Sequence, residues 1–238
     1  MIIDAERLDY AQLGEILRET EEPCVIRGCL GQRFIAAGMG ERSLSIYGVP
    51  GNALGAYMNG ARIEVFGNAQ DAAGDTMNAG RIIIHGSAGD ALGYAMRGGE
   101  IYVCGSAGYR AGVHMKAYGD RVPVMVVGGA VGSFLGEYQA GGLIIVLGLG
   151  AAGPLAGDFP CTGMHGGRVF LRSDCRDIAF PEQVSVRQAA DSDIEEISKY
   201  IAEYCRLFGA DERELLASRF TVVGPNTQSP YRQLYAAN

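Results

Sequence analysis

Short apolar runs recur along the middle of the chain, and each run except the last is followed by a glycine or a glycine pair. They occupy residues 44–46, 63–66, 82–84, 101–103, 125–127, 143–147 and 169–171. Their apolar residues alternate with other residues, as expected for β-strands. Two series are in register from run to run: Leu44, Ile63, Ile82, Ile101, Met125 and Ile144, and Ile46, Val65, Ile84, Val103, Val127 and Val146. This period of two predicts that both series share one inward face.

Glycines follow the same repeat. The leading glycines Gly48, Gly67, Gly86 and Gly105 are 19 residues apart, and Gly129 and Gly148 are again separated by 19. A second glycine lies seven positions after the leading one, at Gly55, Gly74, Gly93, Gly112 and Gly136. Most units add a third at plus three, and residues 28–31 resemble an earlier, less regular copy. We expect these glycines to be structural, at positive φ or where neighbouring backbones approach closely.

The repeat length selects the fold. A unit of 19 residues is too short for a strand–helix–strand unit, which needs roughly 30. Stacked strands with glycine corners instead predict a mainly β protein, a parallel β-helix of about seven coils over residues 23–173. Parallel crossovers are almost always right-handed, so we expect that hand. Met58, Met77, Met96 and Met115 recur in register and are expected to fill the core.

The two ends differ from the middle. Residues 1–22 are predicted to form an N-terminal arm with a short amphipathic helix over residues 10–18. In residues 174–238, Ser192 and Glu195 have the spacing of a capping box, and Gly209 is expected to end the helix that follows. A second helix is predicted over residues 211–218, and residues 225–231 have the composition of an extended tail.

Composition limits the possible partners and compartments. The 238 residues include 36 glycines and carry a net charge of −7, which disfavours nucleic acid as a partner. No apolar run approaches about 18 residues and no apolar leader follows the start, so we expect no membrane segment and a cytoplasmic location. The six cysteines contain no Cys-x-x-Cys pair and are expected to be free thiols.

Candidate chemistry is weak. Residues 148–153 read Gly-x-Gly-x-x-Gly, but the prolines and glycine that follow disfavour the helix that a dinucleotide site requires. Ser87 and Ser106 lack the first glycine of a nucleophile elbow. The spacing of His85, His114 and His165 selects no partner for a cysteine. The residues therefore predict no catalytic, cofactor-binding or metal-binding residue in this chain, and indicate a scaffold rather than a free-standing hydrolase.

Two surfaces remain as candidate contacts. Asn59, Asn78, Arg97 and Lys116 form a stacked polar row, which is either a solvated ridge or an interface. Residues 161–167 end a long irregular loop and contain a cluster of glycines. These glycines either belong to a functional loop or allow the coil to close tightly. Tyr231 and Tyr235 in the tail are further candidate interface residues.

The glycine pattern resembles the C-terminal β-helix domain of the glutamate synthase large subunit, in its stand-alone form. The residues that carry the resemblance are 67–71, 86–90, 96–99, 111–116, 136–137, 140–142 and 163–167, with 220–225 and 230–235 at the end. The β-helix subunit of formylmethanofuran dehydrogenase has similar coils and is the alternative.

The resemblance implies a non-catalytic structural subunit. In that family a cysteine-dependent amidotransferase and an FMN and iron–sulfur protein form glutamate from glutamine and 2-oxoglutarate, so these would be the partners and would hold the cofactors. Met1 is not a processed nucleophilic cysteine, and no three-cysteine cluster motif is present. A scaffold for another oxidoreductase and homo-oligomerisation remain open.

Overall fold

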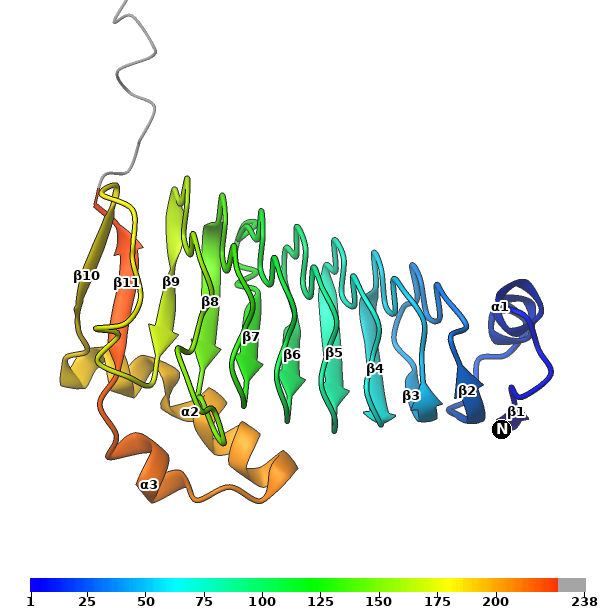
Figure 1. Ribbon diagram of the computed structural model, residues 1–238. Coiled ribbons are helices and arrows are strands. Elements are labelled where there is room, and N and C mark those ends of the chain that lie inside the picture. Colours follow the sequence, from blue (N-terminus) through cyan, green and yellow to red (C-terminus); the bar gives the residue numbers. More distant parts are fainter. Residues whose placement is uncertain (227–238) are drawn as a thin grey trace, which may run out of the picture.

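The computed structural model describes residues 1–226, which build one sheet with one helix at its N-terminal end and two helices along its C-terminal half (Figure 1). The strands are β1 (Ile2–Asp4), β2 (Cys24–Leu30), β3 (Ser43–Val49), β4 (Asn59–Phe66), β5 (Ala79–Ile84), β6 (Glu100–Val103), β7 (Val124–Val127), β8 (Ala140–Val146), β9 (Gly166–Leu171), β10 (Val184–Gln188) and β11 (Thr221–Pro225). The helices are α1 (Tyr10–Glu19), α2 (Asp191–Phe208) and α3 (Glu212–Leu216). The spatial order is β1 to β9 in sequence, then β11 and β10.

Strands β2 to β9 are parallel and stack in the register that the sequence predicts. Leu44 pairs with Ile63, Ile63 with Ile82 and Ile82 with Ile101. The mainly β parallel solenoid is thus confirmed, with about eight turns. The predicted range, residues 23–173, includes β2, where a register shift between Ile26 and Cys29 accompanies the less regular copy of the repeat.

The interior is lined by the two predicted apolar series, whose members are all at most 1% exposed. Met58, Met77, Met96 and Met115 are fully buried and fill the core as expected. Gln139 takes the methionine position of the next coil and is also fully buried. Its Nε2 donates to the carbonyl oxygens of Gly141 and Gly142, at 3.2 and 3.1 Å, which satisfies that amide nitrogen inside the solenoid.

Polar side chains join successive coils. The Asp71 carboxylate accepts the backbone N–H of Asp90 at 2.9 Å, and the Asp90 carboxylate accepts that of Tyr109 at 2.8 Å. A second series runs beside it, where Asn68 accepts from Ser87 and the Ser87 hydroxyl accepts from Ser106. Side chains of one coil therefore accept backbone hydrogen bonds from the next coil, in addition to the hydrogen bonds between the strands.

The N-terminal arm contains more than the predicted helix. Helix α1 covers the expected residues, is capped by Asp9, and buries Leu13 and Leu17. Strand β1 also joins the sheet in parallel with β2. The buried amide of Gln32 holds this arm, because its Nε2 donates to the carbonyl oxygens of Ala5 and Leu8 at 2.8 and 2.9 Å.

The C-terminal region corrects one prediction. The capping box at Ser192 and Glu195 is wrong, because α2 begins at Asp191 with Ala190 as its N-cap, and the carboxylate of Asp193 accepts the Ala190 N–H. The end at Gly209, in the left-handed conformation, is confirmed. Helix α3 lies within the second predicted helix, whereas the antiparallel pair β10 and β11 was not expected.

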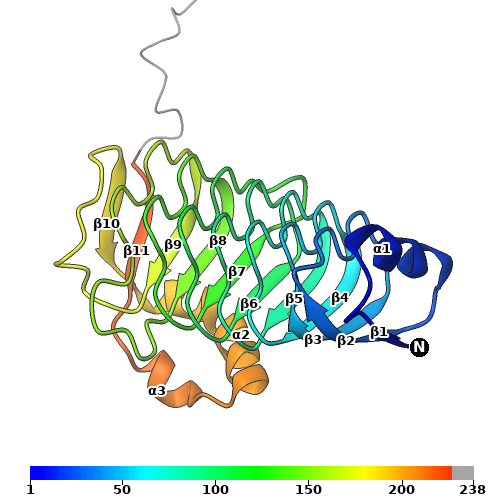
Figure 2. The same ribbon diagram turned by 45° about the vertical axis from the view of Figure 1, so that its right-hand side comes forward.

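Helix α2 gives the sheet a second apolar layer outside the solenoid (Figure 2). Its side chains Ile197, Ile201 and Tyr204 pack with outward-facing residues of β6 to β9. The outward residues concerned are Tyr102, Val124, Val126, Leu143, Ile145 and Phe170. In both views α2 and α3 lie on the C-terminal half of the solenoid, and no described helix covers the outer face of β3 and β4.

Candidate interaction face

The outward positions change character along the sheet. On β6 to β9 they are mostly apolar and buried beneath α2. On β3 to β5 they are Ser43, Ser45, Tyr47, Arg62, Glu64, Phe66, Arg81, Ile83 and His85. We call the part on β3 and β4, with Arg62 and Glu64 beside Tyr47 and Phe66, the open outer face.

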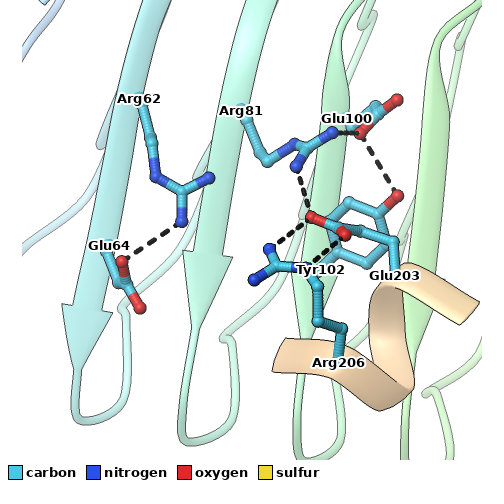
Figure 3. Close-up of polar contacts among 7 residues, drawn as sticks. All are labelled: Arg62, Glu64, Arg81, Glu100, Tyr102, Glu203 and Arg206. Carbon is cyan, nitrogen blue, oxygen red and sulfur yellow. Dashed lines mark hydrogen bonds and ion pairs between the residues drawn. The ribbon is translucent and has the colours of Figure 1, made fainter. Parts of the chain in front are cut away.

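A polar network holds α2 on β5 and β6, the strands next to this face, and the Arg62–Glu64 pair lies apart from it (Figure 3). Arg81 on β5 binds Glu100 on β6 and Glu203 on α2, and Arg206 also binds Glu203, at 2.7 and 2.8 Å. The Tyr102 hydroxyl donates to Glu100 at 3.2 Å. These hydrogen bonds thus hold the last turns of α2 against the starts of β5 and β6.

The carboxylates of this region are held in their charged form. The hydrogen bonds from Arg206, followed by the charge of Arg81, lower the pKa of Glu203 against the effect of burial. Burial acts most strongly on Glu64, but the hydrogen bond from His85 and the charge of Arg62 still lower its pKa. Both groups therefore act as fixed negative charges that position arginines, not as acids that exchange a proton near neutral pH.

Aromatic rings stack on one another at the carboxyl ends of β3, β4 and β5. Tyr47 and Phe66 stack with centroids 4.6 Å apart, and Phe66 and His85 stack at 4.8 Å. The edge of Phe208, the last residue of α2, meets His85 at 5.3 Å. Tyr47 and Phe66 remain 45% and 38% exposed, so the stack continues past the helix as an open aromatic surface.

A shallow groove lies at the starts of β4, β5 and β6. It is lined by the glycines Gly60, Gly80 and Gly99 and by the charged residues Arg62, Arg81 and Glu100. A Cβ at Gly80 would stand 2.3 Å from the Ala61 carbonyl oxygen. Close backbone contact therefore requires glycine at this strand start.

The structure places the predicted polar row beside this groove. Asn59, Asn78, Arg97 and Lys116 occupy equivalent positions, since the backbone N–H of each donates to the carbonyl oxygen of Met39, Met58, Met77 and Met96 respectively. Asn59, Arg97 and Lys116 are exposed and Asn78 is half-buried. The row is continuous along the coils, and its role as an interface stays a prediction. Tyr231 and Tyr235 lie outside the described residues.

The predicted structural glycines sit at two kinds of position. Those at plus seven, Gly55, Gly74, Gly93, Gly112 and Gly136, have φ between 61° and 73°. The leading glycines Gly67, Gly86, Gly105 and Gly129 lie against the previous coil, where a Cβ would stand 2.2 to 2.4 Å from an atom of that coil. At Gly48 it would stand 2.1 Å from the Cys29 carbonyl oxygen.

Groups with catalytic potential are used structurally. Ser87 and Ser106 accept backbone hydrogen bonds from the following coil. His114 stacks on Tyr138 with centroids 5.2 Å apart. Burial raises the pKa of the Cys161 thiol to about 12, which suppresses its thiolate form. Within residues 1–226 no group of three or more His, Cys, Asp or Glu side chains is placed to hold a metal ion.

The structure also shows the surroundings of the two other candidate sites, residues 148–153 and 161–167. Residues 148–153 lead into a loop, and the next helix, α2, begins only at Asp191, so no helix N-terminus follows them directly to bind a pyrophosphate. In the stretch 161–167, Gly163 has a φ of 67° and a Cβ there would stand 2.5 Å from the Tyr138 ring. Tight coil closure therefore accounts for this glycine.

Sequence reasoning missed the open outer face. The strand alternation already marks Arg62, Glu64 and Phe66 as outward, because each neighbours an inward residue. The repeat alone does not show where α2 packs. Because α2 covers only part of the sheet, the outward aromatic rings beneath it are buried and those beyond it are exposed.

Comparison with known proteins places the chain in a family. A family model described as the GXGXG motif matches residues 20–226. The chain belongs to the GXGXG motif family. A relative, the uncharacterized protein MJ1350 of Methanocaldococcus jannaschii, is 43% identical over 250 residues, covering 99% of this chain and 96% of that protein.

A solved structure shares the GXGXG solenoid fold. It belongs to the formyltransferase/hydrolase complex (FhcABCD) of Methylorubrum extorquens, determined with methylofuran. The TM-score is 0.63 at 24% identity, over 83% of this chain and 71% of the other. At this identity the similarity shows the fold alone. Among residues 1–226, none of the helices has the length and apolar composition needed to span a bilayer.

Proposed function

We propose that the chain is a non-catalytic structural subunit of a cytoplasmic glutamate-synthase-like complex. The observation that carries the proposal is the GXGXG match, which extends over residues 20–226 and therefore over the whole solenoid. The partners would be an amidotransferase and an FMN and iron–sulfur protein. They would hold the catalytic residues and the cofactors, and this chain would hold none.

The solenoid is suited to such a role by its rigidity. Eight parallel strands are paired in a fixed register, and the side chains of Asp71, Asp90 and Ser87 tie each coil to the next. The strands within this stack have little freedom to move separately, because each of them is hydrogen-bonded to a neighbouring strand on both sides. It would therefore hold partner active sites in a fixed relation.

Reconstitution tests the proposal. The chain is mixed with separately purified amidotransferase and FMN/iron–sulfur proteins of its own organism, and glutamine-dependent glutamate formation from 2-oxoglutarate is measured. We expect the chain to raise the rate severalfold and to co-elute with both partners. If the polar row is an interface, Arg97→Glu with Lys116→Glu lowers this gain, whereas Tyr118→Ser, at a side chain 69% exposed, does not.

Two results contradict the proposal. One is a failure of the chain to bind either partner. The other is activity in isolation, either stoichiometric FMN on the purified chain or hydrolysis of glutamine without partners.

A second candidate is a scaffold subunit in a formylmethanofuran-type oxidoreductase. The observation that favours it is the fold shared with a chain of the formyltransferase/hydrolase complex. Mass spectrometry of proteins that co-purify with the untagged native chain separates the two. An amidotransferase with an FMN/iron–sulfur protein supports the first candidate, and a molybdenum or tungsten enzyme supports the second.

A further inference from the structure

Helix α2 shows what the outer face of this sheet binds. Its apolar stripe, with Ile201 and Tyr204, covers the outward apolar residues of β6 to β9. Its carboxylates reach arginines at the starts of strands: Glu196 binds Arg168 on β9, and Glu203 binds Arg81 on β5. An acidic amphipathic helix is therefore the ligand that this face already holds within the chain.

The same surface continues beyond the end of α2. Arg62 on β4 pairs in register with Arg81, so it is the next arginine of the same row. The helix has ended at Phe208, and within residues 1–226 no helix carboxylate forms an ion pair with Arg62, whose charge acts on Glu203 only at longer range. Arg62 instead pairs with Glu64 on its own strand, at 3.3 Å. Tyr47 and Phe66 continue the aromatic row without cover.

The charges of this surface favour an acidic partner. Glu64 is bound by both Arg62 and His85, and Glu203 by both Arg81 and Arg206. Arg62 keeps 39% of its side chain exposed. On β2 the exposed Arg27 makes no ion pair with any described residue. The guanidinium groups of Arg62, which is paired only with Glu64, and of Arg27 on the neighbouring strand are thus the cations exposed at this surface, although the chain carries −7 overall.

We propose that the open outer face is the docking site of an amphipathic helix of a partner chain, with acidic residues beside its apolar stripe. The helix lies across β3 and β4 and continues the layer that α2 begins. Tyr47 and Phe66 are its apolar anchors, since aromatic residues dominate the energy of such contacts. A carboxylate of the partner pairs with Arg62, as Glu203 pairs with Arg81. The inference applies to either assembly considered above.

Photo-crosslinking tests the occupant. The photoreactive residue p-benzoylphenylalanine replaces Phe66 in the full chain, produced in its native host, and the cross-linked peptides are sequenced. We expect the cross-links to fall on one segment of one partner. That segment should be a helix with acidic residues beside its apolar stripe. The same probe at Tyr109, which is 54% exposed on the turns, serves as control and should not label that segment.

Substitutions test the chemistry. Arg62→Glu and Phe66→Ser should each lower the partner recovered with the chain about tenfold, while Tyr109→Ser leaves it unchanged. Changing the cross-linked partner's acidic residue to arginine should restore recovery with Arg62→Glu. Thermal melting of each variant checks the fold, and Tyr47→Ser replaces Phe66→Ser if that variant melts early.

The proposal is wrong if recovery is unchanged in folded Arg62→Glu and Phe66→Ser variants. It is also wrong if the cross-link falls on a second copy of this chain, or on a basic or non-helical segment. These readouts do not depend on glutamate formation, so they separate this inference from the proposed function.

Discussion

At the scale of single residues, the positions five, seven and nine after each leading glycine have positive φ in every central coil, and of these three only the middle one is always glycine. In one coil these are Ala53, Gly55 and Tyr57, with φ of 63°, 65° and 57°. The N–H groups of Ala53 and Tyr57 donate to the following coil, whereas that of Gly55 donates to the preceding coil at Ile35. A Cβ on Gly55 would stand 2.9 Å from Ile82 Cδ1 in the core. Glycine is therefore required at this position both by the positive φ and by the lack of room for a Cβ in the core.

A second class of glycine is required by the side chain of the preceding coil. Asp90 accepts the N–H of Tyr109, and its Oδ1 lies 2.1 Å from where a Cβ on Gly108 would be. Gly89 has the same relation to Asp71, at 2.2 Å. The repeated pairing of glycine with an aspartate follows, because the aspartate of one coil occupies the space above the glycine of the next.

We predict that Gly108→Ala destabilises the chain by about 2 kcal/mol or more, because the new methyl group meets both the Asp90 carboxylate and the backbone of the previous coil. Gly153→Ala is the matched control, since nothing lies within 4 Å of its Cβ and its φ is not in the left-handed region. That variant should be neutral or slightly stabilised. Chemical denaturation measures both, and equal stabilities would refute the steric account.

At the scale of elements, the start of α2 is fastened by one buried carboxylate. Asp193 accepts hydrogen bonds from both Arg187 Nη atoms and from the Ala190 N–H. The hydrogen bonds from Arg187, with the smaller contributions of Ala190 and Arg168, lower the pKa of Asp193 from 3.8 to about 2 against the effect of burial. Strand β10, which carries Arg187, is thereby linked to the helix that covers the outer face.

This shift predicts a pH-dependent contribution to stability. Because the folded pKa is the lower one, the contribution is full above about pH 5 and is lost as the pH falls from about 4 to 2. Asp193→Asn should cost about 2 kcal/mol at pH 7 and progressively less in acid.

Urea unfolding at several pH values measures the difference between Asp193→Asn and the wild type. Asp191→Asn serves as control, because this exposed carboxylate lies on the same turn without an arginine partner among the described residues. It should cost only a few tenths of a kcal/mol. A difference for Asp193→Asn that stays constant down to pH 2 would contradict the assignment.

The elements that the sequence predicted correctly have a regular pattern of their own. Strands β3 to β9 and the inward series follow from the 19-residue repeat, and the helices α1, α2 and α3 follow from helical spacing and from the stop at Gly209. Strands β1, β10 and β11 have no counterpart in the repeat, and their pairing is set by contacts distant in the chain. The capping box failed because Asp193, which pairs with Arg187, competes for the helix start. That partner could not be identified from spacing.

At the scale of the whole molecule, the solenoid has unequal halves. Strands β6 to β9 lie between two apolar layers, the interior and the cluster beneath α2. Strands β3 and β4 have the interior layer only, and their outer face carries Arg62, Glu64 and two exposed rings. Repeat proteins open coil by coil, since each coil contacts only its neighbours. The half with one layer should therefore open at lower free energy.

We predict that native-state hydrogen exchange followed by mass spectrometry finds β3 and β4 less protected than β6 to β9. The variant Ile201→Asp places a charge in the cluster beneath α2, where Ile201 is fully buried. It should lower protection in β6 to β9 and leave β3 and β4 nearly unchanged, because these strands do not depend on α2. A control at the exposed Ser192, Ser192→Asp, should change neither region. Uniform protection along the wild-type solenoid, or an equal loss in both halves of Ile201→Asp, would mean that the solenoid unfolds as one unit and that the outer layer does not divide it.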